Sequence, residues 1–451
     1  MKRLFTWTAC FACLLTCVSL RAQTRQVSLS DCIAIAMENN PDMMVSREDY
    51  KKARAQYEMA RSENRIQISA DVKSNAYELP YNRIKKDGTV KTDSYRSLGL
   101  FAGSTVSYKL FDLTRSKREK SALMGIDLAG LNNEKMRSSI VLNVKSAYYT
   151  YMLARESVSL QDELRKKNRQ KLEKTRLFYK NGQRPILDVT KAEVDLASSE
   201  LEYKKTQHQL NIARSNLISA MGLSESEIEI LPSVAVEMPA VKLGIEQLMT
   251  IAQDHYPELR AVRLNKEIQK YNIEVERALR YPVVDVFASF GFENKDLLWY
   301  KDKENKVGQD LGGKWDIAPM FGVTARVPLY TGGMITARID AAKAEYYKSY
   351  YNEKKMLSSM RVAISNYHQQ LSELLKQVEL SNLMKANAEK HLALAQKSYE
   401  GGVGSQLALQ DAETSVLSAV LSEKKARYEY LITLAKLSNA VGVGEEDLCA
   451  K

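Results

Sequence analysis

The side chains that most often carry chemistry are few in this chain, and they do not cluster. The four histidines are scattered over the sequence: His208, His255, His368 and His391. No two of them have the spacing that would let a helix present a pair to one metal ion. The glycine-rich stretch 401–404 lacks the Lys-Ser/Thr pair of a phosphate-binding loop. The sequence therefore predicts no catalytic residue, no metal site and no cofactor, and the protein is not expected to be an enzyme.

Two short segments combine turn-forming residues with an acid. The first holds Gly182, Pro185 and Asp188, and the second holds Gly402, Gly404 and Asp411. Glycine and proline favour tight turns, and an acid in the first turn of a helix complements the positive end of the helix dipole. Both segments are therefore expected to reverse the chain between two helices.

Long helices are predicted on both sides of these turns. They cover residues 112–180, 185–221, 334–400 and 405–441. The first of them has apolar residues at helical spacing and no proline. At a rise of 1.5 Å per residue it would be about 100 Å long, several times the length of an ordinary globular helix. Helices of this length must lie along one another in a coiled-coil-like arrangement.

Four strands complete the predicted elements. They cover residues 66–79, 97–111, 282–293 and 317–330. Each has about ten residues or more, which is the length that a tilted strand needs to cross hydrocarbon. Each alternates an apolar face with a polar, charged face, as a strand between lipid and a water-filled lumen does. A soluble sandwich with one buried face is the alternative, although a sandwich needs more strands than two hairpins.

The number of strands has a consequence for assembly. Open sheet edges are not tolerated in lipid, and the smallest membrane barrels have about eight strands. Four strands cannot close a barrel, so several copies of the chain would be needed. A dimer would give eight strands and a trimer twelve. A wide polar lumen favours the larger number, but the strand count does not choose between them.

The pattern of elements occurs twice. Residues Leu29–Pro41 return as Ile245–Pro257, 216 positions later. So long a period marks a duplicated domain rather than a solenoid unit. The predicted organisation is a signal peptide at 1–22, a first repeat at 23–222, a linker at 223–242, a second repeat at 243–442 and a short tail at 443–451.

The N-terminal segment has the features of an export signal. Lys2 and Arg3 precede the uncharged stretch 4–20, and Ala22 is a small residue suited to cleavage. A lipoprotein signal ending at Cys17 is the alternative, but the threonine before this cysteine fits such a signal poorly. Removal of the segment lowers the net charge from +11 to about +8. The remaining charges alternate in sign along helices, so nucleic acid is not an expected partner.

The order of these elements carries a family resemblance. Short helices lead to two strands, a long helix, a glycine turn and a returning helix, all of it twice. The matching pieces are Asn40-Pro41 with its echo Tyr256-Pro257, the turns at Gly182 and Gly402, and Leu329–Gly333 after the last strand. From about Val27 to Gly442, the chain resembles the outer membrane efflux protein family, the TolC-like outer membrane factors.

This resemblance implies an α+β membrane protein that works as a homotrimer. Each protomer would give four strands to a twelve-stranded outer-membrane β-barrel, continued in the periplasm by a coiled-coil barrel of α-helices. The partners would be outer-membrane lipid, a periplasmic adaptor (membrane fusion) protein and an inner-membrane pump. The implied function is a passive exit duct for small molecules such as drugs or toxic compounds. A duct for type I protein secretion and a non-conducting periplasmic coiled-coil scaffold are the alternatives.

The resemblance also points to residues at the helical turns. Tyr399 and Asp411 match the positions of a gate tyrosine and a constricting aspartate, and Asp188 matches an aspartate that helps to hold the tips closed. Gly404 stands where the family can have an arginine tie, so Arg184 is the expected substitute. The residues expected to touch the adaptor are Gly182, Pro185, Gly402 and Gly404.

Two interpretations of Asp411 remain open at this point. Three copies could form a ring of carboxylates that narrows the pore and attracts cations. Alternatively, Asp411 could serve only to complement the dipole of the helix that it begins. For Asp188 the second interpretation is favoured.

Overall fold

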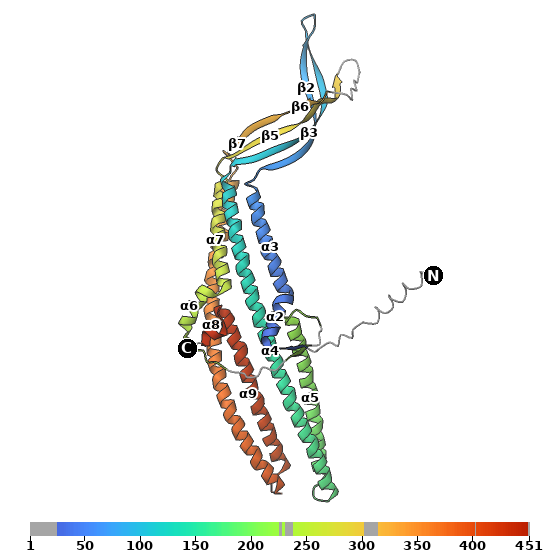
Figure 1. Cartoon of the computed structure of the whole chain (residues 1–451), viewed down its shortest axis with the longest axis vertical. Coiled ribbons are helices and arrows are strands. Elements are labelled where there is room, and N and C mark those ends of the chain that lie inside the picture. Colours follow the sequence, from blue (N-terminus) through green and yellow to red (C-terminus); the bar gives the residue numbers. More distant parts are fainter. Residues whose placement is uncertain (1–24, 225–227, 231–237, 302–313, 402, 450–451) are drawn as a thin grey trace, which may run out of the picture. The chain divides into compact units, whose positions relative to one another are not determined.

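The computed structural model describes residues 25–224, 228–230, 238–301, 314–401 and 403–449 (Figure 1). The predicted signal peptide and part of the predicted linker therefore lie outside the described residues. The chain forms two compact units. The first contains 1–47, 132–260 and 356–451, and the second contains 48–131 and 261–355. Each unit thus takes segments from both sequence repeats, so the compact units do not coincide with the repeats.

The second unit carries an antiparallel sheet. Its described strands are β2 (Gln67–Ile84), β3 (Val90–Phe111), β5 (Val283–Lys301), β6 (Asp316–Ile317) and β7 (Met320–Arg326). The strand order is β2-β3-β5-β6, and β7 also pairs with β5. The hairpin of the first repeat is joined to that of the second by pairing of β3 with β5, from Tyr95 opposite Lys301 to Phe111 opposite Val284.

The strands differ from their predicted limits at three places. Pairing of β2 with β3 continues to Ile84 and Val90, through residues predicted as a polar loop. Strand β5 likewise continues to Lys301 rather than ending at 293. Backbone pairing needs no apolar side chain, so it persists where the alternation of polar and apolar residues stops. The predicted strand 317–330 is instead divided into β6 and β7 around Pro319, which has no amide hydrogen for the ladder.

Helices make up the rest of the described chain. The two long hairpins are α4 (Leu113–Lys180) with α5 (Ile186–Ala220) and α8 (Met334–Glu400) with α9 (Gln406–Val441). The shorter helices are α2 (Leu29–Asn39), α3 (Pro41–Ser62), α6 (Ile245–His255), α7 (Pro257–Ala278) and α10 (Glu445–Cys449). Residues predicted as a tail thus include a helix, and its Leu448 is buried. No described helix has the length and apolarity of a membrane span.

The core of the first unit is built from both repeats. Fully buried side chains from the first repeat, such as Tyr148 and Leu217, belong to one cluster with Leu248, Ile364 and Leu434 from the second. The N-terminal strand β1 (Arg25–Val27) pairs in parallel with β4 (Ile228–Ile230), which follows the first hairpin. In Figure 1, α5 returns beside the lower part of α4, and α9 returns beside α8.

The repeated Asn/Tyr-Pro and glycine positions have one structural reason. Each long hairpin ends at a glycine with positive φ, Gly222 at 74° and Gly442 at 81°. A Cβ at Gly222 would lie 2.6 Å from the Cα of Asn40, and one at Gly442 would lie 2.7 Å from the Cα of Tyr256. Only glycine therefore allows the hairpin end to pack against the corner before Pro41 or its counterpart.

Candidate functional site

The tip of the first helical hairpin is a glycine-terminated reversal. The backbone amide of Gln183 donates to the carbonyl of Phe178, and the amide of Gly182 donates to the carbonyl of Tyr179, both at 2.9 Å. With φ of 71° at Gly182, this is a Schellman motif that ends α4. Pro185 then occupies the N-cap position of α5 in an extended conformation. The expected turn roles of Gly182 and Pro185 thus have a direct geometric basis.

The second tip reverses more tightly. The amides of Val403 and Gly404 both donate to the carbonyl of Ser398, at 3.1 and 2.8 Å. A Cβ at Gly404 would lie 2.8 Å from the backbone nitrogen of Tyr399. The absence of an arginine here therefore has a steric cause, because a side chain would force the loop off the last turn of α8. Ser405 caps α9 by accepting from the amide of Ala408.

Arg184 connects the two tips. Its guanidinium lies 4.9 Å from the centroid of the Tyr399 ring, which belongs to the other hairpin. It also forms an ion pair with Asp188 one helical turn away, at 3.6 Å. The structure thus brings together three of the four predicted gate residues. A cation over an aromatic face and a half-exposed ion pair each contribute about 0.5–1 kcal/mol, so this contact is weak and reversible.

Asp411 lies apart from this contact. Its side chain is exposed, and its backbone carbonyl accepts from the Ser415 hydroxyl one turn later. It stands in the second turn of α9 rather than the first, which weakens the interpretation that it serves the helix dipole. Gly402 lies outside the described residues.

A second polar connection between the hairpins was not apparent from the sequence. The Gln410 amide donates to an Asp195 carboxylate oxygen at 2.7 Å, which joins α9 to α5. Lys171 on α4 forms an ion pair with the same carboxylate at 3.5 Å. The Lys171 and Asp195 side chains are only 12% and 9% exposed. These positions are not related by the repeat, and charged residues are common on long helices, so no pattern distinguished them.

Glu413 lies one helical turn beyond Gln410 in the same region. Burial raises the pKa of its carboxyl group above the ordinary value, and the negative charge of Asp195 adds to this effect. The positive charges of Lys171 and Lys167 act in the opposite direction without cancelling it. Together with the Asp195 contact, this makes the region behind the tips electrostatically coupled, whereas the tips themselves are held by one weak contact.

The sheet of the second unit has two different faces. One bears large apolar side chains that are strongly exposed: Ile68 at 73%, Val72 at 75%, Phe321 at 86% and Val323 at 68%. The other bears polar groups in contact with one another. The Thr105 hydroxyl donates to Asp71 at 3.2 Å and lies 3.4 Å from the Ser289 hydroxyl. One face therefore suits hydrocarbon and the other water.

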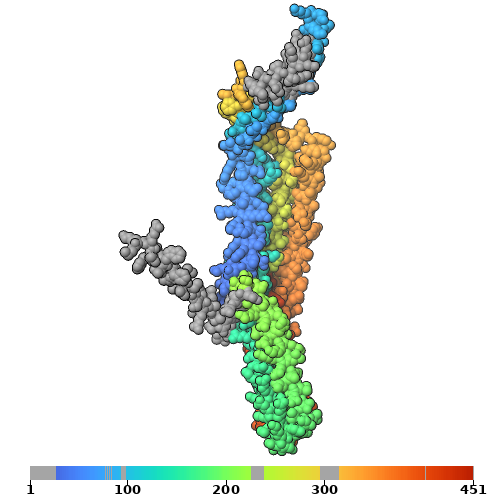
Figure 2. All heavy atoms as spheres, turned by 90° about the vertical axis from the view of Figure 1, so that its right-hand side faces the viewer, coloured from blue at the N-terminus to red at the C-terminus, as the bar shows by residue number. Residues whose placement is uncertain are grey.

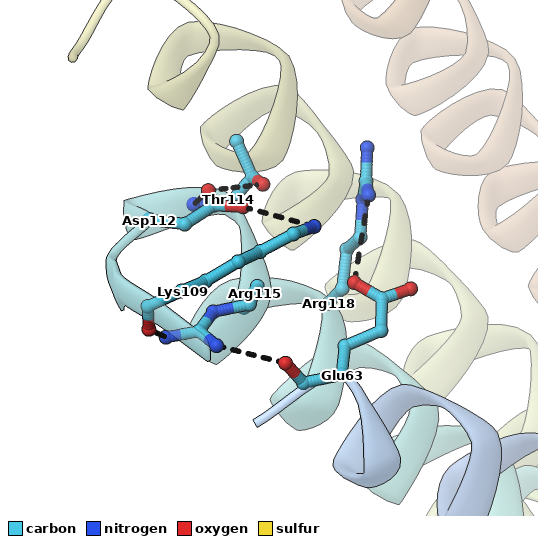
Figure 3. Close-up of polar contacts among 6 residues, drawn as sticks. All are labelled: Glu63, Lys109, Asp112, Thr114, Arg115 and Arg118. Carbon is cyan, nitrogen blue, oxygen red and sulfur yellow. Dashed lines mark hydrogen bonds and ion pairs between the residues drawn. The ribbon is translucent and has the colours of Figure 1, made fainter. Parts of the chain in front are cut away.

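The passage from β3 into α4 is fixed by a buried arginine (Figure 3). Arg115 donates to the backbone carbonyls of Glu63 at 2.8 Å and Lys109 at 2.6 Å. Asp112 accepts from the amide and hydroxyl of Thr114, which starts the helix. The guanidinium thus ties the ends of α3 and β3 to the first turn of α4. Among the described residues no cluster of metal-ligating side chains is present.

Both halves of the chain match one family model. The model is that of the outer membrane efflux protein, and it matches residues 32–223 and 248–443. The chain belongs to the outer membrane efflux protein family. The expected family, outer-membrane location and efflux role are thereby confirmed.

Relatives of this outer membrane efflux protein come from two kinds of export system. The alkaline protease secretion protein AprF of Pseudomonas aeruginosa is 24% identical over 462 residues, covering 99% of this chain and 90% of AprF. The probable efflux pump outer membrane protein TtgC of Pseudomonas putida is 22% identical, covering 92% of this chain and 83% of TtgC.

Solved structures show the same fold. The CmeC outer membrane channel of Campylobacter jejuni has a TM-score of 0.74 at 16% identity, covering 92% of this chain and 85% of CmeC. The outer membrane protein VceC of Vibrio cholerae has a TM-score of 0.72 at 19% identity, covering 93% of this chain and 97% of VceC.

Proposed function

We propose that this protein is the exit duct of a tripartite export system, in which three copies complete one outer-membrane barrel. The one-sided sheet carries the proposal. Its exposed apolar face has no cover within the chain, and hydrocarbon is the environment in which such a face is stable. Its polar face would then line a water-filled lumen.

The number of copies follows from the sheet edges. Each chain contributes two hairpins, and a sheet of that size has open edges that lipid does not tolerate. Pairing between neighbouring copies would satisfy these edges, and three chains would give the twelve-stranded barrel expected from the family. The long hairpins would continue the duct on the periplasmic side, where an adaptor and an inner-membrane pump would dock on the tips around Gly182, Pro185, Gly402 and Gly404.

The tips would act as the gate. The Arg184 contact with Tyr399 and Asp188 links the two hairpins of one protomer and is weak enough to break when a partner binds. Asp411, which is exposed on α9, would form the carboxylate ring that narrows the pore in the trimer. The protein would catalyse no reaction, and the energy for transport would come from the pump.

The cargo is proposed to be small toxic molecules, as for TtgC, which is named for an efflux pump. Protein secretion is a second candidate, because AprF is named for protease secretion and is matched over nearly the whole of this chain. Deletion of the gene distinguishes them. Greater sensitivity to drugs or solvents supports efflux, whereas loss of a secreted protein from the medium supports secretion.

The duct itself is tested in lipid bilayers. The purified protein should remain in membranes after a salt wash, run as an oligomer that heat dissociates, and conduct ions. A protein that a salt wash releases and that gives no conductance would instead be the periplasmic scaffold. Asp411→Ala should change the conductance and its block by divalent cations. The same conductance and the same block as in the wild type would show that no carboxylate ring exists.

A further inference from the structure

The polar face of the sheet also carries two phenylalanines and three glycines. Phe101 and Gly103 lie on β3, Phe287 and Gly291 lie on β5, and Gly322 lies on β7. In the strand register, Gly103 is opposite Gly291, and Phe287 is opposite Gly322. Both phenylalanines are half-buried, whereas aromatic residues on the other face are exposed, as Phe290 is at 59% and Phe292 at 50%.

The two rings occupy the space that the glycines leave free. The Cζ atom of Phe101 lies 2.7 Å from the position that a Cβ at Gly103 would take, and its Cε2 lies 2.8 Å from that of Gly291. The Cζ atom of Phe287 lies 3.0 Å from the Cβ position of Gly322. Each ring therefore lies down along the sheet on a neighbouring glycine instead of standing away from it.

This arrangement is unusual for strand residues, whose side chains normally stand roughly perpendicular to the sheet. A glycine in a strand weakens it unless a neighbouring group covers the backbone, and an aromatic ring on the adjacent strand can do so. At Phe287 the contact is simple, because the three nearest atoms to the Gly322 Cβ position all belong to the ring. At Gly103 and Gly291, backbone atoms are equally close, so a side chain there would also disturb the strands.

We propose that the glycines at 103, 291 and 322 set the width of the lumen by holding the rings of Phe101 and Phe287 flat against the wall. The inference rests on the proposed function, in which this face lines the duct. Three copies would place six rings around the bore at this level. Rings that lie flat leave the passage wide for bulky cargo, and rings that stand upright would narrow it.

Gly322→Ala is the decisive variant. The added methyl group displaces the Phe287 ring, whose far end is free to turn, without meeting backbone atoms. Its single-channel conductance should fall below that of the wild type, and the size of polyethylene glycol that still enters the channel should decrease. The double variant Gly322→Ala/Phe287→Ala should regain the wild-type values. Ala288→Val, which adds bulk to β5 on the opposite face, is the matched control and should leave both values unchanged.

Phe287→Ala alone gives an independent test that adds no atoms to the sheet. A flat ring occupies little of the bore, so its removal should change the conductance only slightly. A large rise in conductance would mean that the ring already stands in the lumen and would overturn the inference. An unchanged conductance in Gly322→Ala, or a double variant that stays low, would overturn it too. A wild-type protein that does not conduct would instead refute the proposed duct.

Discussion

At the scale of single residues, Arg184 shows how a contact can move between repeat positions. The family arginine would stand at 404, but the tight second turn leaves no room for a side chain there. Arg184 occupies the corresponding position of the first tip, where the Schellman turn is wider, and reaches Tyr399 across the gap between hairpins. The connection between the tips is thus kept while its origin changes from one repeat to the other.

Replacement of Arg184 by alanine should loosen the tips. The variant loses the Tyr399 contact and the Asp188 ion pair, together about 1 kcal/mol, which corresponds to roughly a fivefold larger population of open tips. The basal conductance of the purified channel should rise accordingly. Arg169→Ala, which removes an exposed ion pair with Glu200 in the same hairpin, is the control and should behave as the wild type. A closed-state conductance equal to that of the wild type would exclude Arg184 from the gate.

Glu413 should make the region behind the tips sensitive to pH. Its pKa is raised above the ordinary 4.5, so the protonated carboxyl group is favoured in the packed hairpins. The resulting stabilisation is complete below about pH 4.5 and is lost as the pH rises through the raised pKa. The distance between spin labels on the two tips should therefore be shorter and less variable at pH 5 than at pH 7.

Glu413→Gln should remove most of this difference, because the amide stays neutral at both values. Glu193 is the repeat counterpart of Glu413 but is exposed and pairs with Arg176. Glu193→Gln should therefore keep the wild-type pH dependence. If Glu413→Gln and the wild type respond to pH alike, other groups are responsible.

At the scale of elements, the connection between sheet and helix is the most strongly determined local feature. A chain that passes from β3 to α4 must leave the ladder of one element before it enters that of the other, so carbonyl groups are left without backbone partners. Arg115 supplies donors to two of them, and its side chain is 7% exposed as a residue. Charge-assisted bonds in such a place are among the stronger ones in proteins.

Arg115→Ala should therefore destabilise the assembled protein much more than Arg118→Ala. Loss of two charge-assisted hydrogen bonds costs about 3 kcal/mol or more. Arg118 makes only a half-exposed ion pair with Glu63 at 4.0 Å, which contributes about 0–1 kcal/mol. The temperature at which the oligomer dissociates on a gel should fall clearly for Arg115→Ala and hardly for Arg118→Ala. Equal losses in the two variants would contradict the role of the buried guanidinium.

At the scale of the whole molecule, the two repeats are interleaved. The buried cluster of the first unit draws on both repeats, and so does the sheet of the second unit, where β3 pairs with β5. In Figure 2 the green atoms of α5 and the teal end of α4 pack closely as one hairpin. Such a hairpin has only a small buried cluster of its own around Leu172 and Val189. A single repeat therefore lacks both the main core and a partner for its edge strand.

Expression of residues 1–242 alone should not give a folded product. The half-chain exposes the apolar surface that the second repeat covers and should be degraded by proteases to which the full chain is resistant. Co-expression with residues 243–451, preceded by the same export signal, should restore some resistant material. A protease-resistant first half on its own would show that the repeats fold independently.

The sequence by itself determined the elements that depend on local patterns. The long helices begin and end within one residue or so of their predicted limits, because glycine and proline interrupt helices at defined positions. The repeat, the one-sided strands and the turn glycines were predictable for the same reason. The ends of β2 and β3 were not, since backbone pairing continues through polar residues that have no strand pattern.

Only the tertiary structure decided which residues meet. The contact of Arg184 with Tyr399, the bond from Gln410 to Asp195 and the ring of Phe287 on Gly322 each join segments far apart in the chain. No spacing within one segment encodes such contacts, because they depend on how helices and strands are paired. The same holds for the compact units, which divide both repeats instead of separating them.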